Sequence, residues 1–189
     1  MISPIPTDWP EDELPYLQEE SSEVLDEESQ LLIVQNIKTN LPFLLLLPSA
    51  RHLQIPEIKF EDGEGSPAAA LTYPPTIFVD PKDVLWFTHD NEWPDAAIVS
   101  AWWQAIAAHE LRHLEPTNDA MWQGGDHWGC ELDCDYFAGV IYREIELAHP
   151  NPIPSHLEIA KLFESFEEDD DHPPGFQRAD AFIRGYKSR

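Results

Sequence analysis

Two histidines and a glutamate at close spacing are the residues of this chain best suited to chemistry. The segment Ala108-His109-Glu110-Leu111-Arg112-His113 contains the pattern H-E-x-x-H. Residues four apart lie one turn above each other on an α-helix, so His109 and His113 would point to the same place. Zinc binds imidazole nitrogen readily and keeps one position for water in catalytic sites. We therefore predict a zinc site here, with Glu110 as the base that accepts a proton from the attacking water.

The pattern lies on an apolar helical stripe. Apolar side chains and the two histidines recur at steps of three or four residues, the spacing of one helix face. The stripe consists of Ile98, Trp102, Ala105, Ile106, His109 and His113. Burying two histidines on such a face is costly unless their ring nitrogens have partners. A metal ion would supply those partners, and hydrogen bonds to backbone carbonyls are the alternative.

Three downstream residues are candidates for the third metal ligand. Glu131 and Asp135 stand one turn apart in a second predicted helix, so Glu131 could bind the metal while Asp135 accepts the free ring N–H of a ligand histidine. Asp119 would imitate the metzincin spacing, but Pro116 occupies the position of that motif's glycine. His127 would give a three-histidine site. We expect Glu131, with Asp119 and His127 as alternatives.

The combined motifs resemble those of the gluzincin metallopeptidases. The segment from Glu131 to Ala138 is similar to the second motif, close to E-x-E-A-D-x-x-A, of the family that contains the CaaX prenyl protease and HtpX. His172 and Pro173, together with Arg178, are similar to the H-P-x-x-x-x-R segment of that family. Phage-exclusion peptidases of the Lit type also carry the H-E-x-x-H motif, and the chain resembles them to a similar degree.

The resemblance implies a role for each matching residue. In that family the two helix histidines and the first glutamate of the second motif bind zinc, the helix glutamate is the base, and the aspartate supports a histidine. The matching residues here are His109, His113, Glu131, Glu110 and Asp135. His172 would face the substrate and help to hold the developing oxyanion, with an ordinary surface histidine as the alternative. The membrane helices of that family are missing, so the resemblance implies a soluble zinc metallopeptidase that hydrolyses peptides or proteins.

Length and charge limit the classes of function. A chain of 189 residues with 42% hydrophobic residues usually forms one domain with a real core. Its formal net charge of −25 predicts repulsion from nucleic acid and from anionic membrane surfaces. We therefore expect a peptide or protein partner and no nucleic acid. A solvated surface explains the charge, and attraction of basic substrates or mimicry of DNA are the alternatives.

No segment is expected to cross a membrane, and the protein is expected in the cytoplasm. The apolar run at residues 41–48 is far shorter than the ~20 residues that a membrane helix needs. Residues 1–30 carry acids and no basic residue, unlike an export signal. Cys130 and Cys134 should be reduced, because a disulfide across one helical turn is geometrically poor. They are expected to pack on the back of the second helix, with metal binding alongside His127 as the alternative.

Residues 1–29 are expected to form an acidic disordered arm, or a prosegment that covers the active site. Residues 30–189 are expected to form one α+β domain of zincin-like fold, in which a small mixed or antiparallel sheet packs on the H-E-x-x-H helix and on the second ligand-bearing helix. The expected elements are helices near 30–37, 94–116, 130–149, 156–166 and 176–186, strands near 43–47, 53–60 and 76–80, and loops at 117–128 and 167–171.

Two interpretations stay open at this stage. The strand near 76–80, just before the metal helix, is either the edge strand that accepts the substrate backbone in gluzincins or an ordinary core strand. The chain itself is either a zinc metallopeptidase or a metal-stabilised acidic binding or inhibitor protein. A structural site in the second case would have four protein ligands, with His127 or a cysteine completing the set.

Overall fold

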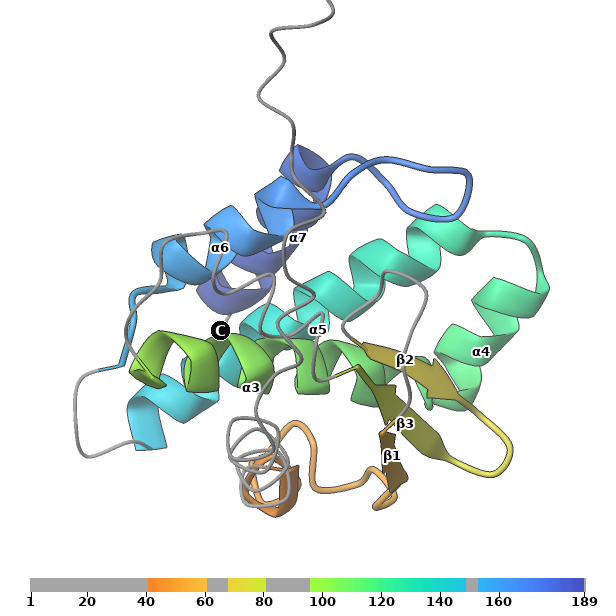
Figure 1. Cartoon of the computed structure of the whole chain (residues 1–189), viewed down its shortest axis with the longest axis horizontal. Helices are drawn as coiled ribbons and strands as arrows, with labels where there is room; N and C mark the ends of the chain where they lie inside the picture. The colour runs from red at the N-terminus through yellow and green to blue at the C-terminus, as the bar shows by residue number, and fades with distance from the viewer. Residues whose placement is uncertain (1–40, 61–67, 81–95, 149–152, 189) are drawn as a thin grey trace, which may run out of the picture.

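The chain folds into a set of packed helices with one small sheet at their side, as the α+β class predicts. The computed structural model describes residues 41–60, 68–80, 96–148 and 153–188 (Figure 1). The elements are β1 (Glu57–Phe60), β2 (Ala68–Leu71), β3 (Thr76–Val79), α3 (Ala96–His113), α4 (Pro116–Gln123), α5 (His127–Ala148), α6 (His156–Ser165) and α7 (Gly175–Lys187). The acidic arm expected at 1–29 and the helix expected near 30–37 lie outside the described residues.

The sheet is mixed, with β3 in the middle. Its order is β1-β3-β2, in which β1 pairs with β3 in parallel and β2 pairs with β3 in antiparallel orientation. Ile77 and Val79 of β3 are buried. Of the two interpretations of this segment, the core strand is therefore correct and the edge strand is wrong. The edge strand that contacts α3 is β2, and Figure 1 shows it close to one end of that helix.

The strand predicted at 43–47 is wrong. Residues 41–44 are helical and are followed by turns, with the Leu45 N–H donating to the Leu41 carbonyl at 3.2 Å and the Leu47 N–H to the Leu44 carbonyl at 3.1 Å. Leu41, Leu44 and Leu47 are buried, whereas Leu46 is 78% exposed. Burial at every third position is typical of a helix. The sequence did not reveal this period, because an unbroken run of apolar residues looks the same in a buried helix and in a buried strand.

Two further boundaries differ from the prediction. Only Glu57–Phe60 of the strand expected at 53–60 forms a β-strand. Strand β2 was not predicted, because alanine is a weak strand former.

The loop expected at 117–128 contains α4, because Pro116 begins a helix instead of only ending one. Proline suits the first helical position, where its missing N–H has no helical partner to lose. Gly125, with φ of 82°, then makes the left-handed turn into α5.

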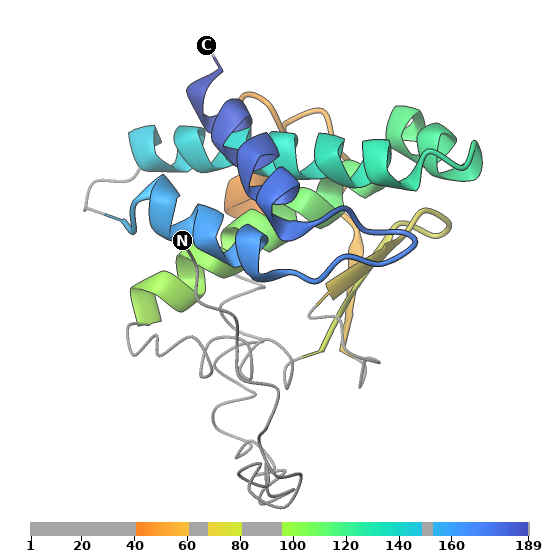
Figure 2. The same ribbon diagram turned by 90° about the horizontal axis from the view of Figure 1, so that it is seen from above.

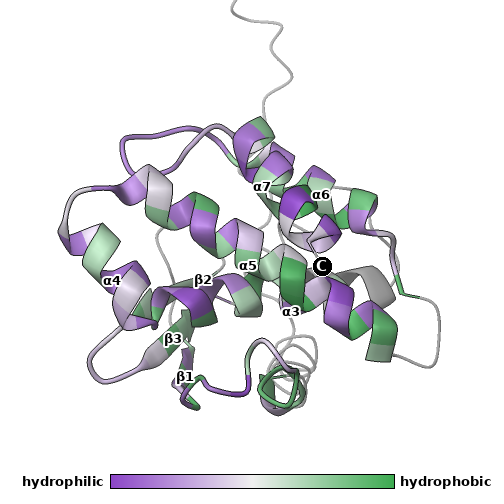
Figure 3. Ribbon diagram, turned by 180° about the vertical axis from the view of Figure 1, so that it is seen from behind, coloured by the Kyte–Doolittle hydropathy of each residue, from purple (hydrophilic) through white to green (hydrophobic). Residues whose placement is uncertain are grey.

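The last two helices agree with the sequence pattern. Ser155 is the N-cap of α6, where its side chain accepts from the Glu158 N–H and the Glu158 carboxylate accepts from the Ser155 N–H. This is the predicted capping box. The acidic segment that follows α6 is irregular, as expected, and is hydrophilic in Figure 3. No helix in the described part of the chain is both long enough and apolar enough to span a bilayer.

Helices α5 and α7 pack with their backbones in contact, and Figure 2 shows them crossing. A Cβ atom added at Gly139 of α5 would lie 2.0 Å from the Phe182 carbonyl oxygen. A Cβ atom added at Gly185 of α7 would lie 1.9 Å from the Tyr136 carbonyl oxygen. Only glycine fits at both positions, and the close crossing brings the beginning of α7, which carries Arg178, against the side of α5.

Candidate metal centre

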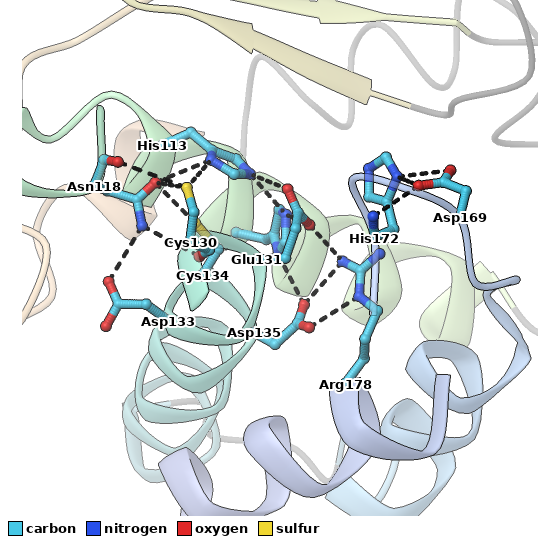
Figure 4. A network of polar contacts seen from close by, with 11 residues as sticks. His113, Asn118, Cys130, Glu131, Asp133, Cys134, Asp135, Asp169, His172 and Arg178 are labelled. Carbon is cyan, nitrogen blue, oxygen red and sulfur yellow. Dashed lines mark hydrogen bonds and ion pairs between the residues drawn. The ribbon is translucent and has the colours of Figure 1, made fainter. Parts of the chain in front are cut away.

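The structure brings His109, His113 and Glu131 together. The two histidines lie in the last turns of α3, and Glu131 lies near the beginning of α5. Figure 4 shows His113 beside Glu131. The Nε2 atoms of His109 and His113 are 3.1 Å apart. The carboxylate of Glu131 closes the triangle, with Oε2 at 3.3 Å from His109 Nε2 and Oε1 at 3.1 Å from His113 Nε2.

These distances fit a tetrahedral metal. Zinc binds nitrogen at about 2.0–2.1 Å, so two ligand atoms of a tetrahedral site lie roughly 3.3 Å apart. The two Nε2 atoms are 3.1 Å apart, and each lies 3.1–3.3 Å from one of the two Glu131 oxygens, which is close to this spacing. Two imidazole nitrogens and a carboxylate oxygen are also a donor set that zinc accepts. The three residues therefore have the types and the proximity that a zinc site needs.

Both histidine rings are held by their Nδ1 atoms. His109 Nδ1 lies 2.8 Å from Asp135 Oδ1, and His113 Nδ1 lies 3.0 Å from Asn118 Oδ1. An Nδ1–H that donates to these oxygens leaves the lone pair of each Nε2 free for a metal and fixes the direction of each ring. Asp135 was expected in this role. Asn118 was missed, because it lies in the helix α4 that the sequence did not predict.

Arg178 is a buried cation at the back of the site. Its Nε and Nη2 bind the two oxygens of Asp135 at 2.9 and 3.0 Å, and Nη2 also lies 3.2 Å from Glu131 Oε2. The guanidinium carbon is 4.7 Å from the centre of the Phe166 ring and 6.0 Å from that of Phe163. Arg178 is only 5% exposed, so it links α7 to Glu131 and Asp135 of α5 away from solvent.

The acidic residues dominate the electrostatics of the site. Burial alone would lower the pKa of His109, but the carboxylates of Glu131 and Asp135 outweigh it and raise the pKa to about 9. Burial also opposes protonation of His113, yet hydrogen bonds with Cys130 and Glu131 raise its pKa to about 11. Despite burial, the histidines hold the pKa of Glu131 well below its usual range. The site therefore favours a positive charge between the rings, which a proton or a metal ion can supply.

Glu110 lies beside the histidines and is available for proton transfer. It is 6% exposed, and burial raises the pKa of its carboxyl group, partly offset by His109 and His113. Within the described part of the chain, its carboxylate makes no hydrogen bond or ion pair. An unpaired carboxylate next to candidate metal ligands suits a general base.

The other candidate residues have different partners. Asp119 accepts a hydrogen bond from the Thr72 hydroxyl at 3.0 Å, and His127 pairs with Asp171 and stacks on Trp122 with ring centres 4.3 Å apart. His172 Nδ1 lies 2.9 Å from Asp169. No hydrogen bond or ion pair among the described residues joins Asp119, His127 or His172 to His109 or His113. Neither alternative ligand is therefore bonded to the two histidines, and the role of His172 toward the oxyanion stays a prediction.

The cysteines do not lie on the back of α5, which corrects the sequence interpretation. Both are free and buried, and Cys130 Sγ lies 2.7 Å from Asn118 Oδ1 and 3.5 Å from His113 Nδ1. The sulfur of Cys134 and ring nitrogens of His109 and His113 all lie within 4.8 Å of one another. Glu131 contacts both Nε2 atoms at 3.1–3.3 Å, so we take it as the third ligand and Cys134 as a further donor.

Known proteins offer no assignment for this site. A scan with protein-family models, a search of curated proteins and a search of solved structures each found no match. The chemistry of the centre is therefore argued from its own residues.

Three carboxylate-to-amide variants test the ligand assignment. We expect Glu131→Gln to weaken zinc binding strongly and Asp135→Asn to weaken it by about 10–100-fold, because Asp135 only orients His109. Asp119→Asn, which removes the same charge within α4, is the matched control and should leave zinc affinity unchanged. Competition with a zinc chelator measures all three. Loss of affinity in Asp119→Asn with no effect in Glu131→Gln would place the third ligand on α4.

Proposed function

We propose that this chain is a zinc-dependent metallopeptidase of the gluzincin type. The observation that carries the proposal is the convergence of His109 Nε2, His113 Nε2 and the Glu131 carboxylate at 3.1–3.3 Å, with the unpaired Glu110 beside them. A zinc ion held by these groups would polarise the scissile carbonyl and lower the pKa of water toward about 7.

The chain's own residues would divide the remaining work. Glu110 accepts a proton from the attacking water and passes it to the leaving amine. Its carboxylate can do this because no hydrogen bond within the described part of the chain already occupies it. Asp135 keeps the His109 ring in place, and Arg178 keeps Asp135 and Glu131 in place. Because these contacts are buried, the ligands are positioned before substrate arrives, which lowers the cost of reaching the transition state.

We place the bound peptide beside strand β2. In the described sheet β2 is an outer strand, and it contacts α3, which carries His109 and Glu110. An extended peptide can pair with such an edge through backbone hydrogen bonds. Leu71 and Tyr73, at the end of β2 and just after it, are 45% and 85% exposed and offer apolar contacts. The strand that would accept substrate is thus β2, not the β3 segment considered from the sequence.

One observation favours a second candidate function. Cys134 forms a group with His109 and His113 in which one ligand atom of each lies within 4.8 Å of the others, so with Glu131 it would give four protein ligands. A permanently closed site of this kind would be structural, and the chain would then be a metal-stabilised acidic binding or inhibitor protein. In either function we expect a peptide or protein partner in the cytoplasm and no nucleic acid, as predicted from the charge.

Metal content and peptide cleavage together test the proposal. We expect one zinc ion per chain in wild type, and we expect His109→Ala and His113→Ala to lose it, because each removes one of two imidazole ligands. His127→Ala is the matched control and should keep the metal. Elemental analysis measures zinc, and a mixed peptide library with mass-spectrometric detection measures cleavage. Absence of zinc in wild type, together with no uptake on titration, would contradict the proposal. Bound zinc with no cleavage of any peptide would favour the second candidate.

A further inference from the structure

Helix α5 presents two metal-binding side chains to the same pair of histidines. Glu131 and Cys134 are three residues apart, on one face of the helix. Cys134 is fully buried, and its sulfur lies within 4.8 Å of ring nitrogens of both His109 and His113. Zinc binds thiolate as readily as imidazole. The centre therefore has one more suitable donor than a catalytic site uses.

The two donors are held differently. Glu131 Oε2 is shared between His109 Nε2 at 3.3 Å and Arg178 Nη2 at 3.2 Å, so a cation already engages this oxygen. The sulfur of Cys134 lies 3.5 Å from Asn118 Oδ1, which is a weak contact, and burial, a hydrogen bond with Cys130 and the charge of Glu131 raise the pKa of this thiol well above its usual range. No cation within the described part of the chain holds this thiol away from the histidines.

We propose that Cys134 is a reversible fourth ligand of the centre, which closes the coordination position that the peptide substrate needs. This inference rests on the proposed function, because it concerns the same metal. In the closing step the Cys134 thiol releases its proton to solvent, the sulfur–metal bond forms, and one water molecule leaves. In the opening step these changes reverse. The centre would then rest in a closed state with ligands His109, His113, Glu131 and Cys134, and peptide binding would compete with the thiolate.

Cys130 provides a matched control for Cys134. It is also buried, lies one turn away on α5, and contacts the same Asn118 oxygen. However, Cys130 Sγ lies 3.5 Å from His113 Nδ1, and Cys130 is not part of the group of close metal-binding side chains that Cys134 forms with His109 and His113. Cys130 is therefore close to the site but outside this group.

Cobalt substitution tests this assignment in the full-length chain. Co²⁺ is a spectroscopic substitute for zinc, and a thiolate bound to it gives a near-ultraviolet charge-transfer band that nitrogen and oxygen ligands do not give. We expect the wild-type Co²⁺ protein to show this band, Cys130→Ser to keep it, and Cys134→Ser to lose it while still binding one Co²⁺. With zinc bound, Cys134→Ser should cleave peptides faster than wild type, because the closed state is removed.

The possible failures are distinguishable. Wild type that binds one Co²⁺ without the thiolate band would overturn the role of Cys134 and leave the proposed function standing. A band that disappears in Cys130→Ser and persists in Cys134→Ser would also overturn it. Failure of wild type to bind Co²⁺ or zinc at all would overturn the inference together with the proposed function. The wild-type spectrum alone shows whether a thiolate binds the metal, so this test does not depend on whether Cys134→Ser folds.

Discussion

Replacing Glu110 by glutamine is expected to leave zinc bound and to lower peptide hydrolysis by about 10²–10⁴-fold. The amide has nearly the same shape as the carboxylate, so the buried site is not disrupted, but it cannot accept the proton of the attacking water. Glu110 has no hydrogen bond or ion pair in the described part of the chain, so folding should not depend on its charge. Steady-state cleavage of a peptide selected from the library, with zinc content measured on the same sample, checks this prediction.

Glu115→Gln is the matched control for this experiment. It removes the same charge a short distance along the chain, where Glu115 pairs with Arg112 at 2.6 Å and with His52 at 3.1 Å, and not with the two candidate ligand histidines. We expect it to keep full activity. If Glu110→Gln cleaved peptides as fast as wild type, Glu110 would not be the base. If Glu110→Gln lost zinc, its role would lie in holding the metal and not in proton transfer.

The parts of the site that follow from local spacing could be predicted from the sequence. The step of four residues between His109 and His113 places both rings on one face of a helix, whatever the rest of the chain does. The capping box at Ser155 and Glu158 is equally local. The arrival of Glu131 and Asp135 at the same place depended on a motif resemblance, because spacing along the chain does not show how two helices pack.

The parts that depend on packing between distant segments could not be predicted. Arg178 lies 43 residues from Asp135 in the chain, and its pairing becomes visible only when α7 lies against α5. Asn118 was missed because Pro116 was interpreted as the end of a helix. The position of the cysteines, in contrast, could have been predicted from the sequence. On a helix with 100° per residue, positions 130, 131, 134 and 135 fall within an arc of about 140°. The sequence therefore contained the signal that Cys134 faces the histidines beside Glu131.

The close crossing of α5 and α7 provides a second large effect, far from the chemistry. An exposed helical glycine replaced by alanine normally gains about 1 kcal/mol of stability. At Gly139 we expect the opposite sign, a loss of about 3 kcal/mol or more, because the new Cβ atom would lie 2.0 Å from the Phe182 carbonyl oxygen. A backbone oxygen cannot rotate away as a side chain can, so α7 must move off α5. The midpoint of urea unfolding measures the change.

The same displacement should reach the metal centre, because α7 carries Arg178, which binds Asp135 and Glu131. We therefore expect Gly139→Ala to weaken zinc binding as well as folding. Leu147→Ala, at a side chain that is 74% exposed on the same helix, should change neither.

Gly185→Ala should act like Gly139→Ala, since its Cβ atom would lie 1.9 Å from the Tyr136 carbonyl oxygen. Because one separation of the two helices relieves both clashes, the double variant should lose less stability than the sum of the single variants. Additive losses would show that the two clashes are relieved independently, and a gain of stability in Gly139→Ala would show that the two helices do not pack backbone to backbone.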